Sequence, residues 1–315
     1  MSLGNKSFWR NKPVLITGIN GFVGSHLASA LEKKGAVVWG ISRSTDKGRI
    51  IKANILDYST IDTFIKEKKI EICFHLAAES LVETGQEDPY NTFKINIEGA
   101  LSILESARKN KLEKVIIAST SHVYGDNKLP YLEKYSPKPS RPYETSKTCV
   151  DLIAQSYAEN FNLPVLIPRF VNIYGPGDLN FTRLIPKTMK AVLSGISPQM
   201  WGGEALREYL FIDDAVDSYI KLCKADPSSL GNNRVFNFSS GSRISVKDLI
   251  EKIIDLSGKN LKIKKIDDER GLEIPSQYVS SDKAKKILKW KSKVALNEGL
   301  KRTLTWYAKY FTQHI

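Results

Sequence analysis

The sequence has few cysteines and no long apolar run, and each shortage excludes a class of protein. Its three cysteines, Cys73, Cys149 and Cys223, lie far apart and are odd in number, which argues against a disulfide framework and a metal site. No apolar stretch approaches the roughly 18–20 residues that span a bilayer. The segment 1–12 lacks the apolar region of a secretory signal. We therefore expect a cytoplasmic protein with no membrane partner and no bound metal.

A concentrated basic segment is also missing, although the formal net charge of the 315-residue chain is +13. Such a charge suits either a nucleic-acid binder or an enzyme for anionic substrates. The lysines are scattered, as at 283–286 and 291–293, and no basic run alternates with aromatic residues. We therefore interpret the charge as a solvated lysine-rich surface and expect no nucleic-acid partner.

Short apolar runs alternate with amphipathic segments over the first two-thirds of the chain. Continuous Val, Ile and Leu runs separated by helical periodicity are typical of parallel strands that helices cover on both faces. The sequence thus predicts an α/β fold with a doubly wound, parallel Rossmann-type sheet, whose ligands bind at the carboxyl ends of the strands. The predicted strands are 14–17, 37–41, 72–76, 115–119, 165–170 and 235–238, with helices at 24–34, 95–109 and 143–162.

This alternation ends near residue 178, where a turn-rich pattern begins. We predict a Rossmann domain over 1–178 plus about 205–240, and a smaller C-terminal substrate-binding lobe from about 179–204 and 241–315. The lobe is predicted to contain helices at 184–193, 245–256, 282–288 and 296–311 and a short strand near 261–266.

A glycine-rich turn follows the first predicted strand. Gly18, Gly21 and Gly24 have the spacing G-x-x-G-x-x-G and lead into a helix. Bare backbone at a helix start lets a pyrophosphate approach the positive end of the helix. A simple glycine turn is the alternative, but the position at the first strand–helix junction favours dinucleotide binding. The predicted contacts are Gly18, Asn20, Gly21, Phe22, Val23 and Gly24.

The end of the second strand bears on which dinucleotide binds. An NAD site usually has a carboxylate there for the ribose hydroxyls, whereas Ser42, Arg43 and Ser44 occupy this place. A guanidinium between hydroxyls suits a 2′-phosphate, so we predict NADP, with NAD as the alternative. Arg43 as an ordinary surface charge is the competing interpretation. Further predicted cofactor contacts are Asn54, Ile55, Leu76, Ala77 and Ala78.

Tyr143 and Lys147 have the spacing Y-x-x-x-K, which places them on one face of a helix. An ammonium there lowers the pKa of the phenol and makes Tyr143 a usable base, and Lys147 is also a candidate contact for the nicotinamide ribose. The spacing alone is common. Together with the glycine turn and the hydroxyl-rich strand end at 119–121, it predicts an oxidoreductive site.

These motifs resemble the extended short-chain dehydrogenase/reductases that modify nucleotide sugars, over nearly the whole chain. The segments 168–177 and 207–214 also match the family pattern. Residues 143–151 resemble CDP-glucose 4,6-dehydratases, and 118–121 resemble GDP-mannose 4,6-dehydratases, which use NADP. The resemblance implies a CDP- or GDP-linked hexose as substrate and a homodimer formed through helices 95–109 and 143–162.

The resemblance also implies roles for individual residues. Tyr143 takes the proton of the sugar C4 hydroxyl while C4 gives up hydride, and Thr120 hydrogen-bonds the same oxygen. Asn172 and Arg207 match positions that hold the diphosphate. Arg183 is either a second cation for the substrate or a surface charge at a helix start.

Ser121 and His122 follow Thr120 at the positions where the family's dehydratases place their C5 base and C6 acid. The family's dehydratases have a glutamate at the position of His122. Three roles are open for His122: it replaces this glutamate as the C5 base, it only contacts substrate in an epimerase, reductase or 4-dehydrogenase, or it is a hydrogen-bonded structural residue. We favour a 4,6-dehydratase, a lyase, with a 4-epimerase or 4-keto reductase as the alternative. Intact Thr120, Tyr143 and Lys147 argue against a non-catalytic dinucleotide-binding protein.

Overall fold

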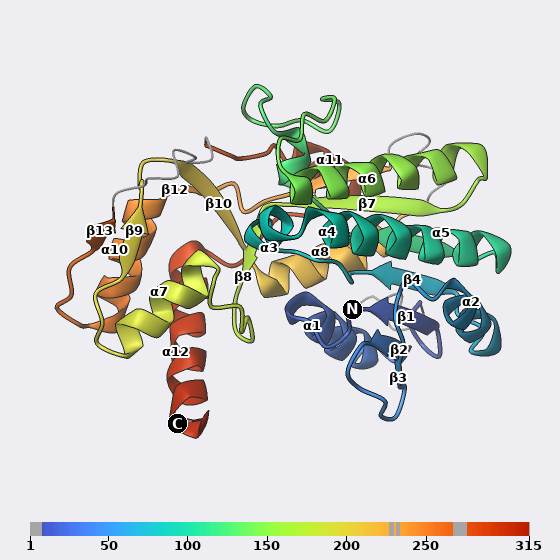
Figure 1. The fold of residues 1–315 in the computed structure, drawn as a ribbon, viewed down its shortest axis with the longest axis horizontal. Helices are drawn as coiled ribbons and strands as arrows, with labels where there is room; N and C mark the ends of the chain where they lie inside the picture. Colours follow the sequence, from blue (N-terminus) through green and yellow to red (C-terminus); the bar gives the residue numbers. More distant parts are fainter. Residues whose placement is uncertain (1–7, 227–229, 231–233, 267–275, 315) are drawn as a thin grey trace.

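The computed structural model describes residues 8–226, 230, 234–266 and 276–314. It consists of a large sheet covered by helices and a smaller lobe at one end of that sheet (Figure 1). No helix within these ranges is long and apolar enough to cross a membrane.

One parallel sheet organises the larger part. Its strand order is β11-β7-β5-β4-β1-β2-β3, and the short β6 also pairs with β7. Because the chain adds β2 and β3 on one side of β1 and the remaining strands on the other, the switch point lies between β1 and β4. The strands are β1 (Pro13–Thr17), β2 (Val37–Ser42), β3 (Ile50–Lys52), β4 (Ile72–His75), β5 (Lys114–Ile117), β6 (Ser119–Thr120), β7 (Val165–Phe170) and β11 (Val235–Phe238).

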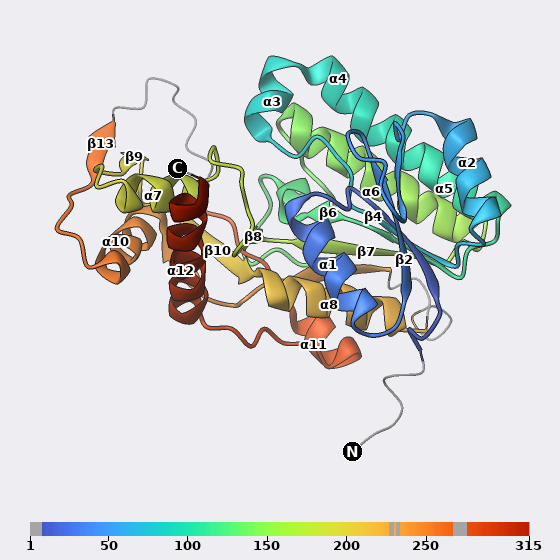
Figure 2. The ribbon, with the colours of Figure 1, turned by 90° about the horizontal axis from the view of Figure 1, so that it is seen from below.

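Helices bury both faces of this sheet, since alternate strand residues point into two different cores. In β1, Leu15 belongs to one core, while Val14 and Ile16 belong to the other. The first core is covered by α2 (Tyr58–Glu67), α5 (Gly99–Lys109) and α6 (Pro142–Asn160), and the second by α1 (Phe22–Glu32) and α8 (Ile212–Lys224) (Figure 2). Shorter helical segments are α3 (Val82–Glu87), α4 (Pro89–Phe93), the π-helix η2 (Lys94–Glu98) and the 3₁₀ turn η3 (Ser121–Tyr124).

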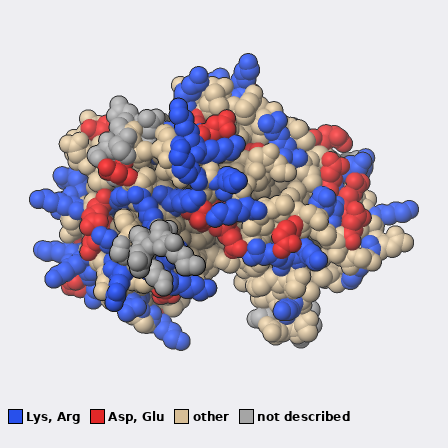
Figure 3. Space-filling model, turned by 180° about the vertical axis from the view of Figure 1, so that it is seen from behind, with Lys and Arg blue, Asp and Glu red and all other residues tan. Residues whose placement is uncertain are grey.

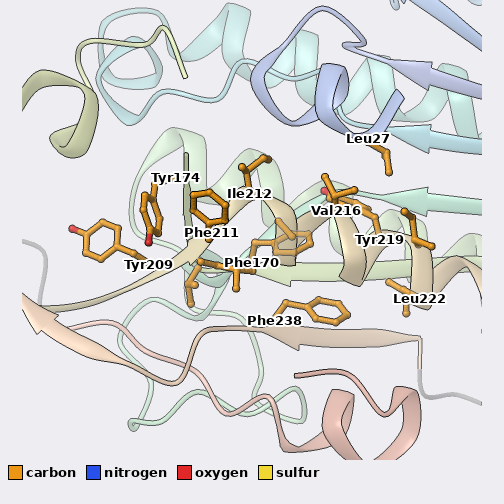
Figure 4. Packing of buried hydrophobic residues seen from close by; sticks show 14 of the residues in the cluster. Leu27, Phe170, Tyr174, Tyr209, Phe211, Ile212, Val216, Tyr219, Leu222 and Phe238 are labelled. Carbon is orange, nitrogen blue, oxygen red and sulfur yellow. The ribbon is translucent and has the colours of Figure 1, made fainter. Parts of the chain in front are cut away.

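The smaller lobe continues from the carboxyl end of β7. It contains a three-stranded sheet in the order β12-β10-β8 and a two-stranded sheet of β13 and β9. Phe170, Tyr174 and Phe211 belong to one hydrophobic cluster that runs from the large sheet into this lobe (Figure 4). The elements are β8 (Asn172–Tyr174), α7 (Leu184–Leu193), β9 (Gln199–Trp201), β10 (Leu206–Phe211), β12 (Arg243–Ser245), α10 (Val246–Ser257), β13 (Lys264–Ile266) and α12 (Leu296–His314). Between β13 and α12, the helix α11 (Asp282–Leu288) packs back against β11 of the large sheet.

The predicted fold class is confirmed, and the six predicted strands of the large sheet are present within two residues of their expected ends. The prediction did not include β3, β6, β8, β9, β10 and β12. Most of these have two or three residues, too few to establish a period of two. The strands β8 and β10 pair with each other and not with the large sheet, although both fall within the predicted Rossmann segments.

The surface carries the positive charge in a dispersed form. Figure 3 shows Lys and Arg side chains over much of one face, with Asp and Glu between them. On this face the charges form a solvated surface and not a continuous basic groove.

A buried ion pair joins α6 to the neighbouring strands β7 and β6. Arg169 on β7 donates from Nε and a terminal nitrogen to the two oxygens of Asp151, at 2.9 and 2.8 Å. Ser119 on β6 donates its hydroxyl to the same carboxylate at 2.6 Å. Both charged residues are almost fully buried. The pair therefore fixes where β6, and with it Thr120, lies against α6.

We expect Asp151→Ala to lower the free energy of unfolding by about 3–5 kcal/mol, because it leaves the buried Arg169 charge uncompensated. Urea denaturation measures this loss. Gln155→Ala is a matched control, since Gln155 also donates to Asp151 but is only partly buried; its cost should stay below about 1 kcal/mol. Equal costs for the two variants would contradict the expectation.

Candidate active site

A cavity of about 830 Å³ lies where the carboxyl end of the large sheet meets the smaller lobe. Small-molecule sites typically have volumes of about 300–1,000 Å³. Residues from both parts of the molecule line it, so a ligand that fills it contacts the sheet edge and the lobe together. The predicted site residues among its walls are Phe22, Val23, Leu76, Ala78, Thr120, His122, Tyr143, Lys147, Asn172, Arg183 and Arg207.

The other predicted residues lie outside this lining. Ser121 is buried in the 3₁₀ turn, and Ile55 packs beneath Gly99. Asn54 is exposed after β3, where its side chain accepts the Leu56 N–H. The remaining ones lie in the glycine turn, in the first turn of α1 and at or just after the ends of β2 and β4: Gly18, Asn20, Gly21, Gly24, Ser42, Arg43 and Ala77.

Two glycines of the glycine turn pack too closely against the backbone to be replaced by a residue with a side chain. A Cβ on Gly24 would lie 2.2 Å from the Gly18 carbonyl oxygen, and one on Gly18 would lie 3.0 Å from the Ala77 nitrogen. Helix α1 starts after Gly21 without a side-chain cap or an acidic residue in its first turn. Its N-terminal amides are thus available to an anion, and the turn fits the pyrophosphate of a dinucleotide.

Asn20 organises the loop after β2, where an adenine ribose would lie. Its amide donates to the hydroxyls of Ser42 and Thr45, at 3.0 and 2.9 Å, and Ser42 in turn accepts the backbone N–H groups of Ser44 and Thr45. Arg43 is exposed between them. The hydrogen-bonded groups of this loop are therefore the hydroxyls of Ser42 and Thr45, and the Arg43 guanidinium lies beside them in the sequence.

A hydroxyl–imidazole pair fixes the end of β4. The Thr17 hydroxyl oxygen accepts the N–H groups of Leu76 and Ala77, which leaves its own hydrogen for Nδ1 of His75, 2.9 Å away. Burial, with a smaller effect of the Lys147 charge, lowers the pKa of His75 to about 3. His75 is therefore neutral and positions the backbone that borders the glycine turn.

Tyr143 and Lys147 both lie at the start of α6, but they do not form a charge pair. Lys147 donates to the Ala118 carbonyl at 2.5 Å, and burial lowers its pKa to about 8. Burial raises the pKa of Tyr143 to about 12, against smaller lowering effects of Arg183 and of a hydrogen bond with Thr120. The prediction that Lys147 lowers the phenol pKa is therefore wrong for this structure, because burial outweighs the lowering effects and Lys147 is not among their sources.

His122 lies next to Tyr143 on the cavity wall, with ring centroids 6.3 Å apart. Its backbone N–H donates to the Thr120 hydroxyl at 3.2 Å, so the 3₁₀ turn fixes both residues. Behind the ring, Nδ1 faces the buried Glu144 carboxylate at 3.5 Å. Sequence reasoning missed Glu144, although its position three residues after Arg141 is that of a capping-box glutamate.

Arg183 reaches the sheet side of the cavity from the start of α7. It pairs with the buried Asp178 at 3.2 Å and donates to the Ser80 hydroxyl at 3.4 Å. Asn172 and Arg207 line the cavity from β8 and β10 of the smaller lobe. The structure therefore brings the three predicted substrate residues to one cavity, with Arg183 near Tyr143. Asp178 was not predicted, because an acid after a glycine turn resembles an ordinary loop residue.

Within the described residues, no group of His, Cys, Asp or Glu side chains is placed to hold a metal ion. The cavity walls supply hydroxyl, imidazole, ammonium and guanidinium groups.

The model of the NAD dependent epimerase/dehydratase family matches residues 14–238, which include the whole large sheet except the first residue of β1. The chain belongs to this family. Membership confirms the resemblance predicted from the motifs and makes the protein an enzyme of the nucleotide-sugar epimerase/dehydratase type.

Relatives in this family catalyse different reactions. A UDP-N-acetyl-alpha-D-glucosaminuronate decarboxylase of Bacillus cytotoxicus is 31% identical over 94% of this chain and 98% of its own length. A dTDP-D-glucose 4,6-dehydratase of Homo sapiens is 27% identical, over 95% and 91%. The structure of a UDP-glucose 4-epimerase from Thermotoga maritima with UDP-glucose has a TM-score of 0.88 and 27% identity, over 95% and 99%.

We expect Gly24→Ala to weaken dinucleotide binding and to lower the free energy of unfolding by about 1–3 kcal/mol, because the added methyl collides with the Gly18 backbone. Thermal unfolding with and without NAD⁺ or NADP⁺ measures both effects. Ser25→Ala, which removes an exposed hydroxyl from the same helix, is the control and should change neither. Normal stabilisation of Gly24→Ala by the dinucleotide would contradict the assignment.

Proposed function

We propose that this enzyme is a nucleotide-sugar 4,6-dehydratase that begins with oxidation of C4. Tyr143 takes the proton of the C4 hydroxyl, and Thr120 hydrogen-bonds the same oxygen. A nicotinamide dinucleotide, when bound, would supply the hydride chemistry. Lys147 lies on the same helix face and orients the ribose of that dinucleotide. The close placement of Thr120, Tyr143 and Lys147 along one cavity supports this first step.

The observation that favours dehydration is the position of His122. The C5 proton of a 4-keto sugar is acidic, and a dehydratase must remove it. C5 and the C4 oxygen are close together in a hexose, and the rings of His122 and Tyr143 lie 6.3 Å apart on the same wall. A general base must come within about 2.6–3.2 Å of the atom that carries the proton. An imidazole in this place suits that transfer near neutral pH.

The protons balance across the proposed reaction. Tyr143 receives the proton of the C4 hydroxyl, and His122 receives the proton of C5. One of the two goes to the departing C6 hydroxide, which leaves as water. The other returns to C5 when the hydride is delivered to C6. The product is a 4-keto-6-deoxy sugar that is lighter than the substrate by one water.

A 4-epimerase is the second candidate, because one structural relative is a UDP-glucose 4-epimerase. Epimerisation needs only Tyr143 and the dinucleotide, since the hydride returns to C4 on the other face. His122 would then contact substrate without moving a proton. A 4-keto reductase would use the same residues on a supplied keto sugar with reduced cofactor.

For the substrate, we propose a CDP- or GDP-linked hexose. Arg207 and Asn172, on the lobe side, suit the diphosphate, because guanidinium forks pair well with phosphate oxygens. Arg183 contacts Ser80 and lowers the pKa of Tyr143, so we place it beside the sugar instead of the diphosphate. The dispersed positive surface (Figure 3) would attract such an anion over long range.

We also propose a homodimer through the outer face of α5 and α6. Leu101 on α5 and Leu152 on α6 are exposed large apolar residues, and Phe161 follows α6. Burial of such side chains against a second copy would remove apolar area from water. The cytoplasm remains the proposed compartment, in agreement with three free thiols.

Incubation with CDP-glucose and GDP-mannose, followed by mass spectrometry, separates the candidate reactions. We expect loss of one water. His122→Gln should slow water loss by about 100-fold or more, the usual effect of removing a general base, while C4 oxidation changes by less than about 3-fold. Tyr143→Phe is the control and should stop both steps. A product of unchanged mass would support the epimerase, and normal dehydration by His122→Gln would contradict the C5 assignment.

Cofactor choice is testable at Arg43. We propose NADP, because Arg43 and Ser42 suit a 2′-phosphate and no acid follows β2 until Asp46. Arg43→Asp should weaken NADP⁺ binding by about 10-fold or more, by loss of one charged contact worth roughly 1.5–3 kcal/mol, and should favour NAD⁺. Dissociation constants for both dinucleotides measure the change. Arg49→Asp, on the neighbouring exposed turn, is the control, and equal effects of the two variants would contradict a specific phosphate contact.

A further inference from the structure

Glu144 lies against the His122 ring without lining the cavity. Its Oε1 is 3.5 Å from His122 Nδ1, and this nitrogen is buried with no hydrogen-bond partner in the part of the chain that the structure describes. His122 itself lines the cavity. The two nitrogens lie on different edges of the imidazole ring. Since Nδ1 faces Glu144, Nε2 is the nitrogen that can meet a ligand in the cavity.

The other oxygen of Glu144 is already engaged. Oε2 accepts the backbone N–H and the hydroxyl of Ser140, at 3.2 and 3.0 Å, and the backbone N–H of Arg141 at 3.3 Å. Burial raises the pKa of Glu144, but the interactions with His122 and Ser140 outweigh this effect and leave the pKa below its usual value. Glu144 is therefore a carboxylate at neutral pH, with one oxygen at the helix start and one at the ring.

The free oxygen determines which ring nitrogen carries hydrogen. A carboxylate only accepts hydrogen bonds, and a neutral imidazole has one N–H and one lone pair. A lone pair on Nδ1 would face the Oε1 lone pairs, whereas an Nδ1–H would donate to them. The separation of 3.5 Å exceeds ordinary hydrogen-bond length, but such contacts are often long in ligand-free enzymes and tighten when substrate binds.

We propose that Glu144 is a positioning residue that holds His122 in the Nδ1–H tautomer and thereby presents the Nε2 lone pair to C5 of the keto sugar. The inference rests on the proposed dehydratase function, since an epimerase needs no base at C5. The arrangement follows a general pattern, in which a buried carboxylate orients a catalytic imidazole that meets the substrate with its other nitrogen.

Glu144→Gln tests this proposal. The amide oxygen can still accept from Ser140 and Arg141, so the helix start is retained. The amide N–H₂ then faces Nδ1 and donates to it, which favours the Nε2–H tautomer and removes the basic lone pair from the cavity. In single turnovers in D₂O with CDP-glucose and GDP-mannose, C4 oxidation should change by less than about 3-fold. Deuterium incorporation at C5 and water loss should fall by about 100-fold.

Ser140→Ala is the matched control. It removes one hydroxyl donor to Oε2 and leaves the Oε1 side unchanged, so any effect should be small and equal for both steps. If Glu144→Gln slows C4 oxidation as much as water loss, Glu144 acts only by holding the start of α6, and the proposal fails. It also fails if wild type and Glu144→Gln lose water at the same rate.

Nitrogen-15 NMR of the imidazoles provides a readout that needs no turnover. We expect an Nδ1–H tautomer for His122 in the wild type and the reverse tautomer in Glu144→Gln, with His122→Gln used to assign the signals. An Nε2–H tautomer in the wild type overturns the positioning role directly. If the wild type forms only C4 epimers, the dehydratase function and the C5 assignment are both wrong. If Glu144→Gln loses water as fast as the wild type, only the positioning role is wrong.

Discussion

The parallel pairing of β1 with β4 is the constraint on which the rest of the site depends. It places the glycine turn directly beside the end of β4, with room for backbone and for little else, since a Cβ on Gly18 would lie 3.0 Å from the Ala77 nitrogen. The Thr17 hydroxyl then accepts two N–H groups of the β4 end and contacts His75. A bulkier turn would separate the two strand ends and misplace the cofactor relative to α6.

Burial sets the protonation of Tyr143 and Lys147. Lys147 has its pKa lowered to about 8, whereas that of Tyr143 is raised to about 12. Desolvation disfavours both charged forms, so burial favours a neutral phenol. The Arg183 guanidinium favours the tyrosinate, and an oxidised nicotinamide, when bound, would supply further positive charge.

Local spacing was enough to predict the parts of the site that lie within one turn or one helix face. The glycine turn, the Tyr143–Lys147 pair and the sheet that positions them follow from periods of two and 3.6 residues. Glu144 and Asp178 were not predicted, because their partners are chosen by tertiary packing. His122 meets Glu144 across 22 positions only after a 3₁₀ turn has bent the chain after β6. Short strands such as β8 and β12 are likewise specified by pairing and not by their own residues.

The reaction itself is the hardest property to infer, for a physical reason. Oxidation at C4 requires a base and a dinucleotide, and the relatives of this chain include an epimerase, a dehydratase and a decarboxylase. What separates dehydration from epimerisation is whether a second base reaches C5, a matter of one side chain and its neighbours. Placing a carboxylate behind the imidazole removes its charge from water. This desolvation costs stability unless the charge is paired. Neither cofactor binding nor C4 oxidation needs Glu144 to hold an oxygen towards His122. Proton transfer at C5 gives that oxygen a function.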